Sequence, residues 1–352
     1  EMVRSAGIGA MDILGGAGIS MGPRNVMAEA YIGAPIAITV EGANIMTRTL
    51  IVFGQGALRS HPYAYAEVRA LEANDLRGFD VAFWGHIGHI VRNFCRSVLL
   101  SVTRGYLAGS PDVHPKTTRY YQRLQWTSAT FAILADVAMG VLGGQLKMKE
   151  KLTGRFADIM AQMYIATCVL RRFEAEGRKE EDLAFVHYCV KNCLVEIQKA
   201  FDGIFDNLTI PGINWFFKGW MGAWSRINSI GSQASDNWSH VISDSMLNNQ
   251  QQRLRLTEGI YVPTDRNQQV ARLDYAYQMV HKAESIEQKM RAAVKSKTLP
   301  RLKGMKLAEE ALAKSVITSE EFKLLQETES VRYDAIMVDD FSEDQYHGRV
   351  YP

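Results

Sequence analysis

The residue of this sequence best suited to acid–base chemistry is Glu41, in the stretch IAITVEGANIMTR from Ile36 to Arg48. It lies between an apolar run and Gly42. The apolar neighbours that we expect to dehydrate it are Ile36, Ile38, Val40 and Ile45. Because dehydration raises a carboxylate pKa, Glu41 could accept and return a proton near neutral pH, and Gly42 would let a substrate approach closely. The alternative is an exposed glutamate at the start of a helix that begins at Asn44.

A glycine-rich motif precedes this stretch. In DILGGAG, Gly15, Gly16 and Gly18 follow what we predict to be an amphipathic helix. The two motifs together resemble the end of the catalytic core of the acyl-CoA dehydrogenase family. In that family a Gly-Gly-x-Gly turn precedes an aromatic-Glu-Gly-Thr segment, whose glutamate removes the α-proton of a fatty acyl-CoA. Glu41 and Gly42 match that second segment.

The resemblance continues through FGQGALRSHPY, from Phe53 to Tyr63, and along the helical remainder of the chain. It points to the large bacterial type that acts in fatty-acid β-oxidation and has an additional C-terminal helical domain. On this comparison residues 1–60 are the end of the catalytic core and residues 61–352 are the C-terminal helical domain. We therefore expect a C-terminal fragment that lacks most of the flavin domain.

The resemblance also implies a reaction. The whole enzyme would bind FAD noncovalently and oxidise a medium- to long-chain acyl-CoA to the trans-2-enoyl-CoA. Glu41 would take the α-proton while flavin N5 takes the β-hydride. Glu41 and Gly42 would contact the substrate, and Gly15 and Gly16 would contact the cofactor. Electrons would pass to an electron-transfer flavoprotein, and the family assembles as homo-oligomers.

Three positions depart from the family pattern. Asp12 stands where the family usually has glutamine, Ala43 where it has threonine, and Val40 where it has an aromatic residue. The glutamine and threonine commonly touch the adenine end or the pyrophosphate of the flavin. We therefore assign no flavin contact to Asp12 or Ala43.

Composition indicates an ordinary soluble protein, with 47 % hydrophobic and 22 % charged residues in 352. The net charge of +2 gives no electrostatic reason to expect a nucleic-acid partner. The four cysteines follow no disulfide framework of secreted proteins, and we expect a bacterial cytoplasmic protein. The apolar run from Phe131 to Leu142 is interrupted by Asp136, so we expect no membrane-spanning segment.

Apolar spacing predicts an all-α fold. Helices are expected over residues 44–60, 62–73, 75–108, 117–147, 268–293 and 319–335, and those between residues 75 and 205 should form an antiparallel bundle. Two stripes illustrate the prediction. One is Phe79, Phe83, Ile87, Ile90, Phe94 and Val98, and the other is Leu183, Val186, Val190, Leu194, Ile197, Phe201 and Ile204. Both should be buried.

A different pattern follows Leu208. Ile213, Phe216, Phe217, Trp220, Met221, Trp224 and Ile227 recur at helical spacing, with Lys218 on another face. This composition is typical of a helix lying in a membrane interface, which would place the protein peripherally on the inner membrane. Packing on the bundle explains the stripe equally well.

Metal binding is not expected from the sequence. His86 and His89 lie three residues apart, and Cys189 and Cys193 lie one turn apart near His187. No carboxylate or third cysteine stands at ligand spacing beside either pair. A hypothesis of another class remains open, in which the chain is a noncatalytic helical module that docks an enzyme on a membrane or a partner.

Overall fold

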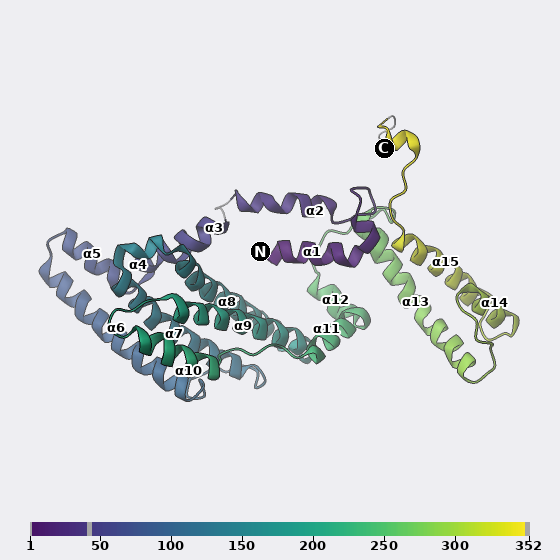
Figure 1. Cartoon of the computed structure of the whole chain (residues 1–352). Coiled ribbons are helices and arrows are strands. Elements are labelled where there is room, and N and C mark those ends of the chain that lie inside the picture. The colour runs from purple at the N-terminus through teal and green to yellow at the C-terminus, as the bar shows by residue number, and fades with distance from the viewer. Residues whose placement is uncertain (1, 41–43, 349–352) are drawn as a thin grey trace. The chain divides into compact units, whose positions relative to one another are not determined.

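The computed structural model describes residues 2–40 and 44–348, and the regular elements of these residues are all helices (Figure 1). The chain divides into two compact units. We call residues 38–258 the central unit and residues 1–37 with 259–352 the terminal unit. The all-α prediction is confirmed. The division at residue 60, which separates a family core from a family C-terminal domain, stays a prediction.

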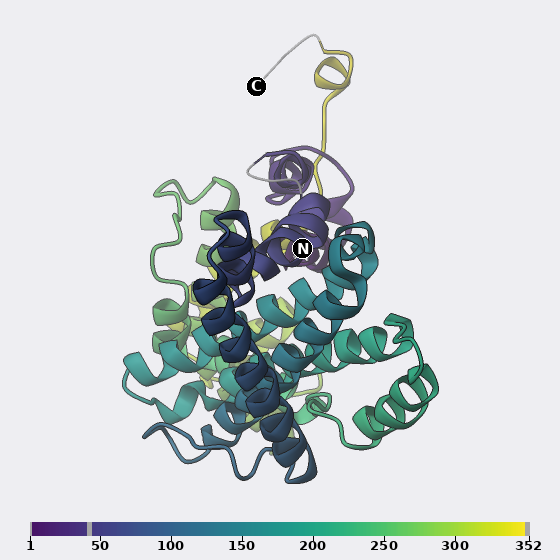
Figure 2. The same ribbon diagram turned by 90° about the vertical axis from the view of Figure 1, so that its left-hand side faces the viewer.

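The central unit contains long helices joined by short connections. Its elements are α3 (Asn44–Met46), the π-helix η3 (Thr47–Gln55), α4 (Gly56–Ser60), α5 (Ala64–Glu72), α6 (Leu76–Val102), α7 (Thr118–Leu142), η4 (Gly143–Met148), α8 (Glu150–Ala175), η5 (Glu180–Asp182), α9 (Leu183–Asn207), the π-helix η6 (Phe216–Met221), α10 (Gly222–Ile227), α11 (Asp236–Asn248) and α12 (Gln250–Leu256). Figure 2, turned by 90°, shows this bundle from the side of α5 and α6.

The core of the central unit lies between α7, α8 and α9. The whole predicted stripe of α9, from Leu183 to Ile204, is buried, and it faces the buried Phe156, Ile159 and Leu170 of α8. Phe156 stacks on Phe53 with ring centroids 4.2 Å apart. Burial of this apolar surface is the main stabilising term for the bundle.

Helix α6 differs from its prediction. Its apolar stripe is largely exposed, with Phe94 54 % and Val98 48 % accessible, and the residues it buries are Ala82, Asn93 and Leu100. The prediction of a buried stripe was therefore wrong in phase. The inner face of α6 has small and polar side chains, and the spacing of apolar residues cannot tell which face a neighbouring helix covers.

The ends of α6 follow local chemistry. The Asp75 carboxylate accepts a hydrogen bond from the Gly78 amide and caps the start. The helix ends at Val102 rather than near residue 108, because Arg104 and Gly105 adopt positive φ angles of 51° and 78°. A Cβ at Gly105 would lie 3.1 Å from the Gln122 carbonyl oxygen, so glycine suits both the turn and the close approach of α7.

The terminal unit contains α1 (Met2–Leu14), the 3₁₀ turn η1 (Gly15–Gly18), α2 (Ala28–Gly33), η2 (Ala34–Ile38, its last residue in the central unit), α13 (Gln269–Lys295), α14 (Met305–Ala313), α15 (Ser319–Ile336) and α16 (Glu343–Tyr346). Ala283, Ile286, Ala311 and Leu325 belong to its separate core. A capping box between Thr318 and Glu321 starts α15. The predicted helices at 268–293 and 319–335 are thereby confirmed.

One helical segment of the described residues, Thr118–Met148, is long and apolar enough to cross a membrane by length and composition. Core helices of soluble proteins share this property. Trp126, Leu134 and Ala138 of this segment are buried in the core of the central unit. The segment is therefore a core helix of the bundle.

Candidate functional site

Glu41 and Gly42, the predicted catalytic and substrate-binding residues, lie outside the described residues. Their described neighbours are informative. Ile36, Val40 and Ile45 are 67 %, 48 % and 70 % exposed, so these side chains do not supply the dehydration that the sequence led us to expect. Burial of the carboxylate would have to come from other groups.

The end of the same stretch is firmly anchored. Arg48 on η3 forms a bidentate salt bridge with Asp158 of α8, and Arg48 Nε lies 2.6 Å from Asp158 Oδ1. The Thr153 hydroxyl donates to the Thr49 carbonyl in the same contact between η3 and α8. A bidentate arginine–carboxylate pair fixes direction as well as distance. Arg48 and Thr49 are thus held in a defined position on the bundle.

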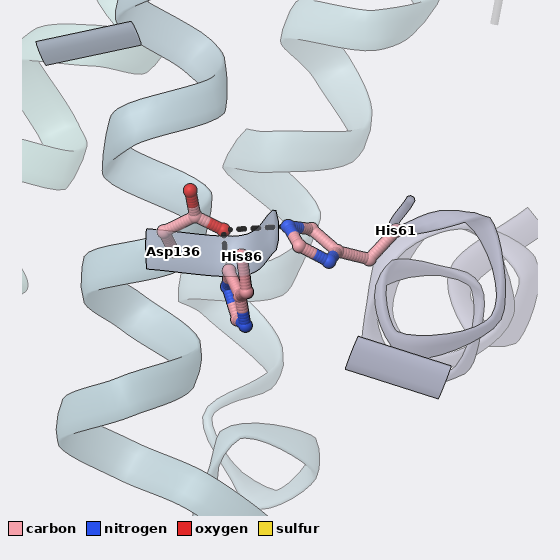
Figure 3. A group of neighbouring side chains, drawn as sticks. All are labelled: His61, His86 and Asp136. Atoms are coloured by element: carbon pink, nitrogen blue, oxygen red, sulfur yellow. Dashed lines mark ion pairs between the residues drawn. The ribbon is translucent and has the colours of Figure 1, made fainter. Parts of the chain in front are cut away.

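Two imidazoles and a carboxylate come together at His61, His86 and Asp136 in the central unit, as Figure 3 shows. Three segments supply them, since His61 follows α4, His86 is on α6 and Asp136 is on α7. His61 Nε2 lies 2.9 Å and His86 Nε2 3.7 Å from Asp136 Oδ1. We call these three residues the histidine–aspartate cluster.

The cluster is buried. Side-chain exposure is 7 % for His61, 19 % for His86 and 3 % for Asp136. Within the described part of the chain, both Asp136 oxygens and both Nε2 atoms lack a well-aligned hydrogen bond. Buried polar groups in native proteins are usually satisfied, so four such atoms in one cluster require a physical explanation.

Neighbouring groups orient both imidazoles. His86 Nδ1 lies 2.8 Å from Glu67 Oε1 and donates its proton to that carboxylate. The backbone amides of Tyr63 and Ala64 donate to His61 Nδ1 at 3.2 and 2.9 Å, at the start of α5. Each ring therefore directs its Nε2 toward Asp136.

Burial lowers the pKa of His61, and the positive charge that His86 and His89 can acquire acts in the same direction, while the Asp136 carboxylate raises it. Burial also lowers the pKa of His89. Both effects favour the neutral imidazole at neutral pH. His89 is not a member of the cluster, because its Nδ1 and Nε2 contact the Arg92 and Asn93 side chains at 3.2 and 2.8 Å.

The second constellation noted in the sequence is Cys189 and Cys193 near His187. His187 Nδ1 accepts a hydrogen bond from the Tyr120 hydroxyl at 2.7 Å. Burial raises the pKa of the Cys193 thiol to about 11 and also raises that of Cys189. A cysteine binds a metal as its thiolate, and raised thiol pKa values oppose formation of the thiolate.

Comparison with protein families shows to which family the chain belongs. Residues 58–341 match the family described as acyl-CoA dehydrogenase, C-terminal, bacterial type. The chain belongs to this family. The resemblance inferred from the sequence motifs is thereby confirmed. Comparison with solved structures gives no match.

Acyl-CoA dehydrogenases generally use FAD, so the predicted flavin contacts at Gly15 and Gly16 can be examined for fit. Gly15 has φ +56° and open space where a Cβ would be, which would let a ligand approach its backbone. At Gly16 the equivalent position is 3.0 Å from Val338 Cγ1, so another side chain of this unit already occupies it. The open space at Gly15 is compatible with a cofactor contact, and the flavin contacts of both glycines stay predictions.

The residues that follow the glycine-rich turn also contact the chain's own C-terminal segment. Ser20 donates to the Asp339 carboxylate, and the Arg24 amide donates to Asp339 Oδ1 at 2.9 Å. A Cβ at Gly22 would collide with the same carboxylate. The absence of a side chain at Gly16 and Gly22 thus allows close packing within the terminal unit.

Sequence reasoning missed the histidine–aspartate cluster. His61 was noted only as part of the motif FGQGALRSHPY, and Asp136 only as an interruption of an apolar run. That interruption was the available signal, because a lone carboxylate inside a core helix needs polar or charged partners. Nothing in the sequence showed that two histidines from other segments supply them.

Proposed function

We propose that this chain is the C-terminal part of an FAD-dependent acyl-CoA dehydrogenase of fatty-acid β-oxidation. The observation that supports this is the family match over residues 58–341, together with the Glu41-Gly42 motif just before it. The enzyme would oxidise medium- to long-chain acyl-CoA to trans-2-enoyl-CoA. We further propose electron-transfer flavoprotein as the electron acceptor and a homo-oligomeric enzyme in the bacterial cytoplasm.

Glu41 is the proposed base. The α-proton of an acyl thioester is weakly acidic, so a base must be held close to it while donors polarise the carbonyl. The backbone N–H of Glu41 is one such donor in the family pattern. Bound FAD supplies the acceptor for the β-hydride. The anchoring of Arg48 on Asp158 would restrict movement of the segment that follows Glu41.

Substitution of Glu41 by glutamine tests this role in the complete, flavin-containing enzyme. Glutamine keeps the shape of the side chain but cannot accept the proton, and positioned bases contribute about 10² to 10⁴ in rate. Single-turnover flavin bleaching by an acyl-CoA should therefore slow by at least about 100-fold. Binding of a nonreactive acyl-CoA analogue should persist, because the thioester contacts and the chain pocket remain.

Glu29→Gln is the matched control, since Glu29 is an exposed carboxylate on α2. It should bleach at the parent rate. Bleaching of Glu41→Gln within about tenfold of the parent would contradict the assignment of Glu41 as the base.

The Trp-rich segment supports a second proposal, that the protein attaches peripherally to the inner membrane. Phe217 is 3 % exposed and packs with Met221 on the bundle core. The other members of the predicted stripe are exposed, and they include Trp220 at 67 % and Ile227 at 76 %. Trp215 beside them is 74 % exposed. An exposed aromatic cluster next to Lys218 suits the boundary between lipid headgroups and acyl chains. This attachment is compatible with the catalytic proposal and with the docking-module alternative.

A further inference from the structure

We propose that the histidine–aspartate cluster binds one divalent transition-metal ion, with His61 Nε2, His86 Nε2 and Asp136 as ligands. Zinc is the probe that tests this. The site is independent of the dehydrogenase reaction proposed above. Its function would be to fix the corner between α4 and α5 against α6 and α7.

The donor atoms have the spacing that a small metal ion requires. All three lie within 4.8 Å of one another. Zinc–nitrogen and zinc–oxygen bonds of about 2.0–2.2 Å in a tetrahedral site place donor atoms about 3.4 Å apart. The observed separations of 2.9 and 3.7 Å from Asp136 Oδ1 lie on either side of this value. Shifts of about half an ångström would bring these two separations to that value.

Within the described residues, no lysine or arginine forms an ion pair with Asp136. Asp136 is almost fully buried, and its described ion-pair partners are His61 and His86. Both of its oxygens lack an aligned donor in the described residues. A buried carboxylate without a cation or good donors costs several kcal/mol. A divalent ion would satisfy Asp136 and both Nε2 atoms at once.

The hydrogen bond at the other ring nitrogen of His86 is of the kind found at histidines that bind metals. Metal-bound histidines almost always donate their other ring N–H to a carboxylate or a carbonyl. His86 already does so, through Nδ1 to Glu67 Oε1 at 2.8 Å. Its Nε2 therefore presents a lone pair toward Asp136, ready for a metal.

His61 differs in one respect. Because its Nδ1 accepts from the amides of Tyr63 and Ala64, the proton of the metal-free ring is on Nε2 and faces Asp136. A metal ion must replace that proton. The proton then either leaves the cluster or moves to His61 Nδ1, where it would end the hydrogen bonds from the Tyr63 and Ala64 amides. Metal and proton thus compete for Nε2, as at metal sites generally.

The ligand set narrows the choice of ion. Two imidazoles and one carboxylate suit zinc and other first-row divalent ions, whereas calcium and magnesium prefer oxygen ligands. Three protein ligands leave a coordination position for water. Partial exposure of His86 gives water access to this position.

The experiment measures zinc bound to the full chain after stripping with a chelator, reloading and removal of excess metal. The parent chain should retain one equivalent. His86→Ala and Asp136→Asn should each lower zinc affinity by at least about 100-fold, and Glu67→Gln by about 10- to 100-fold. His89→Ala is the matched control, one turn further along α6, and should retain zinc with unchanged affinity.

X-ray absorption at the zinc edge of the parent chain provides a readout that does not depend on whether the variants fold. The expected spectrum has nitrogen and oxygen neighbours near 2.0–2.1 Å with imidazole scattering. A sulfur shell near 2.3 Å would assign the zinc to cysteine thiolates and overturn the proposal. Failure of the parent chain to retain zinc, or equal loss in His89→Ala and His86→Ala, would overturn it too.

Discussion

Replacing Phe156 by alanine tests the centre of the bundle. Its side chain is 0 % exposed, stacks on Phe53 at 4.2 Å and meets the edge of Phe131 at 5.8 Å. Complete burial puts the expected loss in unfolding free energy at about 3–5 kcal/mol, and each aromatic contact contributes about 0.5–1.5 kcal/mol beyond area burial. Phe131 is only half-buried, so Phe131→Ala should cost about 2–3 kcal/mol.

Tryptophan fluorescence is a suitable probe, because all 6 tryptophans of the chain lie between residues 84 and 238, in the central unit. Urea unfolding followed by this signal reports that unit without contribution from the terminal unit. Phe94→Ala makes the same substitution at a side chain that is 54 % exposed. It should cost less than about 1 kcal/mol.

A loss below about 1 kcal/mol for Phe156→Ala would refute the packing described here. The double variant of Phe156 and Phe131 adds a sharper criterion. Two rings in edge-to-face contact should show a coupling energy of about 0.5–1.5 kcal/mol. Strict additivity of the two losses would mean that the rings do not touch.

Two further predictions concern the central unit. The chain should float with anionic liposomes, and the double variant Trp215→Glu, Trp220→Glu should stay folded but no longer be recovered with them. The control Tyr164→Glu, at an exposed ring on α8, should float like the parent. Unchanged recovery of the double variant would contradict membrane attachment. Burial lowers the pKa of His187, so just below pH 6.5 the unfolded chain binds more protons than the folded chain. The free energy of unfolding should therefore fall as the pH decreases through this range. In urea titrations at pH 5.5 and 7.5, His187→Gln should show a smaller difference in unfolding free energy than the parent.

The sequence predicted the helices of the bundle well, because most of them bury one continuous apolar stripe. On α9, residues at alternating spacings of three and four from Leu183 to Ile204 are all buried. Phe156 and Ile159 on α8 are buried as their spacing predicts. Local periodicity is sufficient to predict the buried face of a helix where neighbouring helices cover its apolar face.

Helix α6 shows why periodicity failed elsewhere. Its inner face has Ala82, His86 and Asn93, and its outer face has Trp84 and Phe94, which are 68 % and 54 % exposed. The apolar stripe identifies a face but not its partner. Contacts with segments far along the chain decide burial here, and a sequence without tertiary information does not contain them in readable form.

The inner face of α6 also explains how the histidine–aspartate cluster forms. Gly85 lies one residue before His86, and a Cβ there would collide with the ring of Tyr63. The missing side chain lets the start of α5 approach α6, which brings His61 to within 4.4 Å of His86 between ring centroids. Ala82 is buried one turn earlier on the same face. Small residues on α6 are therefore the reason that two imidazoles from different segments can share one buried carboxylate, and Gly85 belongs to the site although it offers no ligand atom.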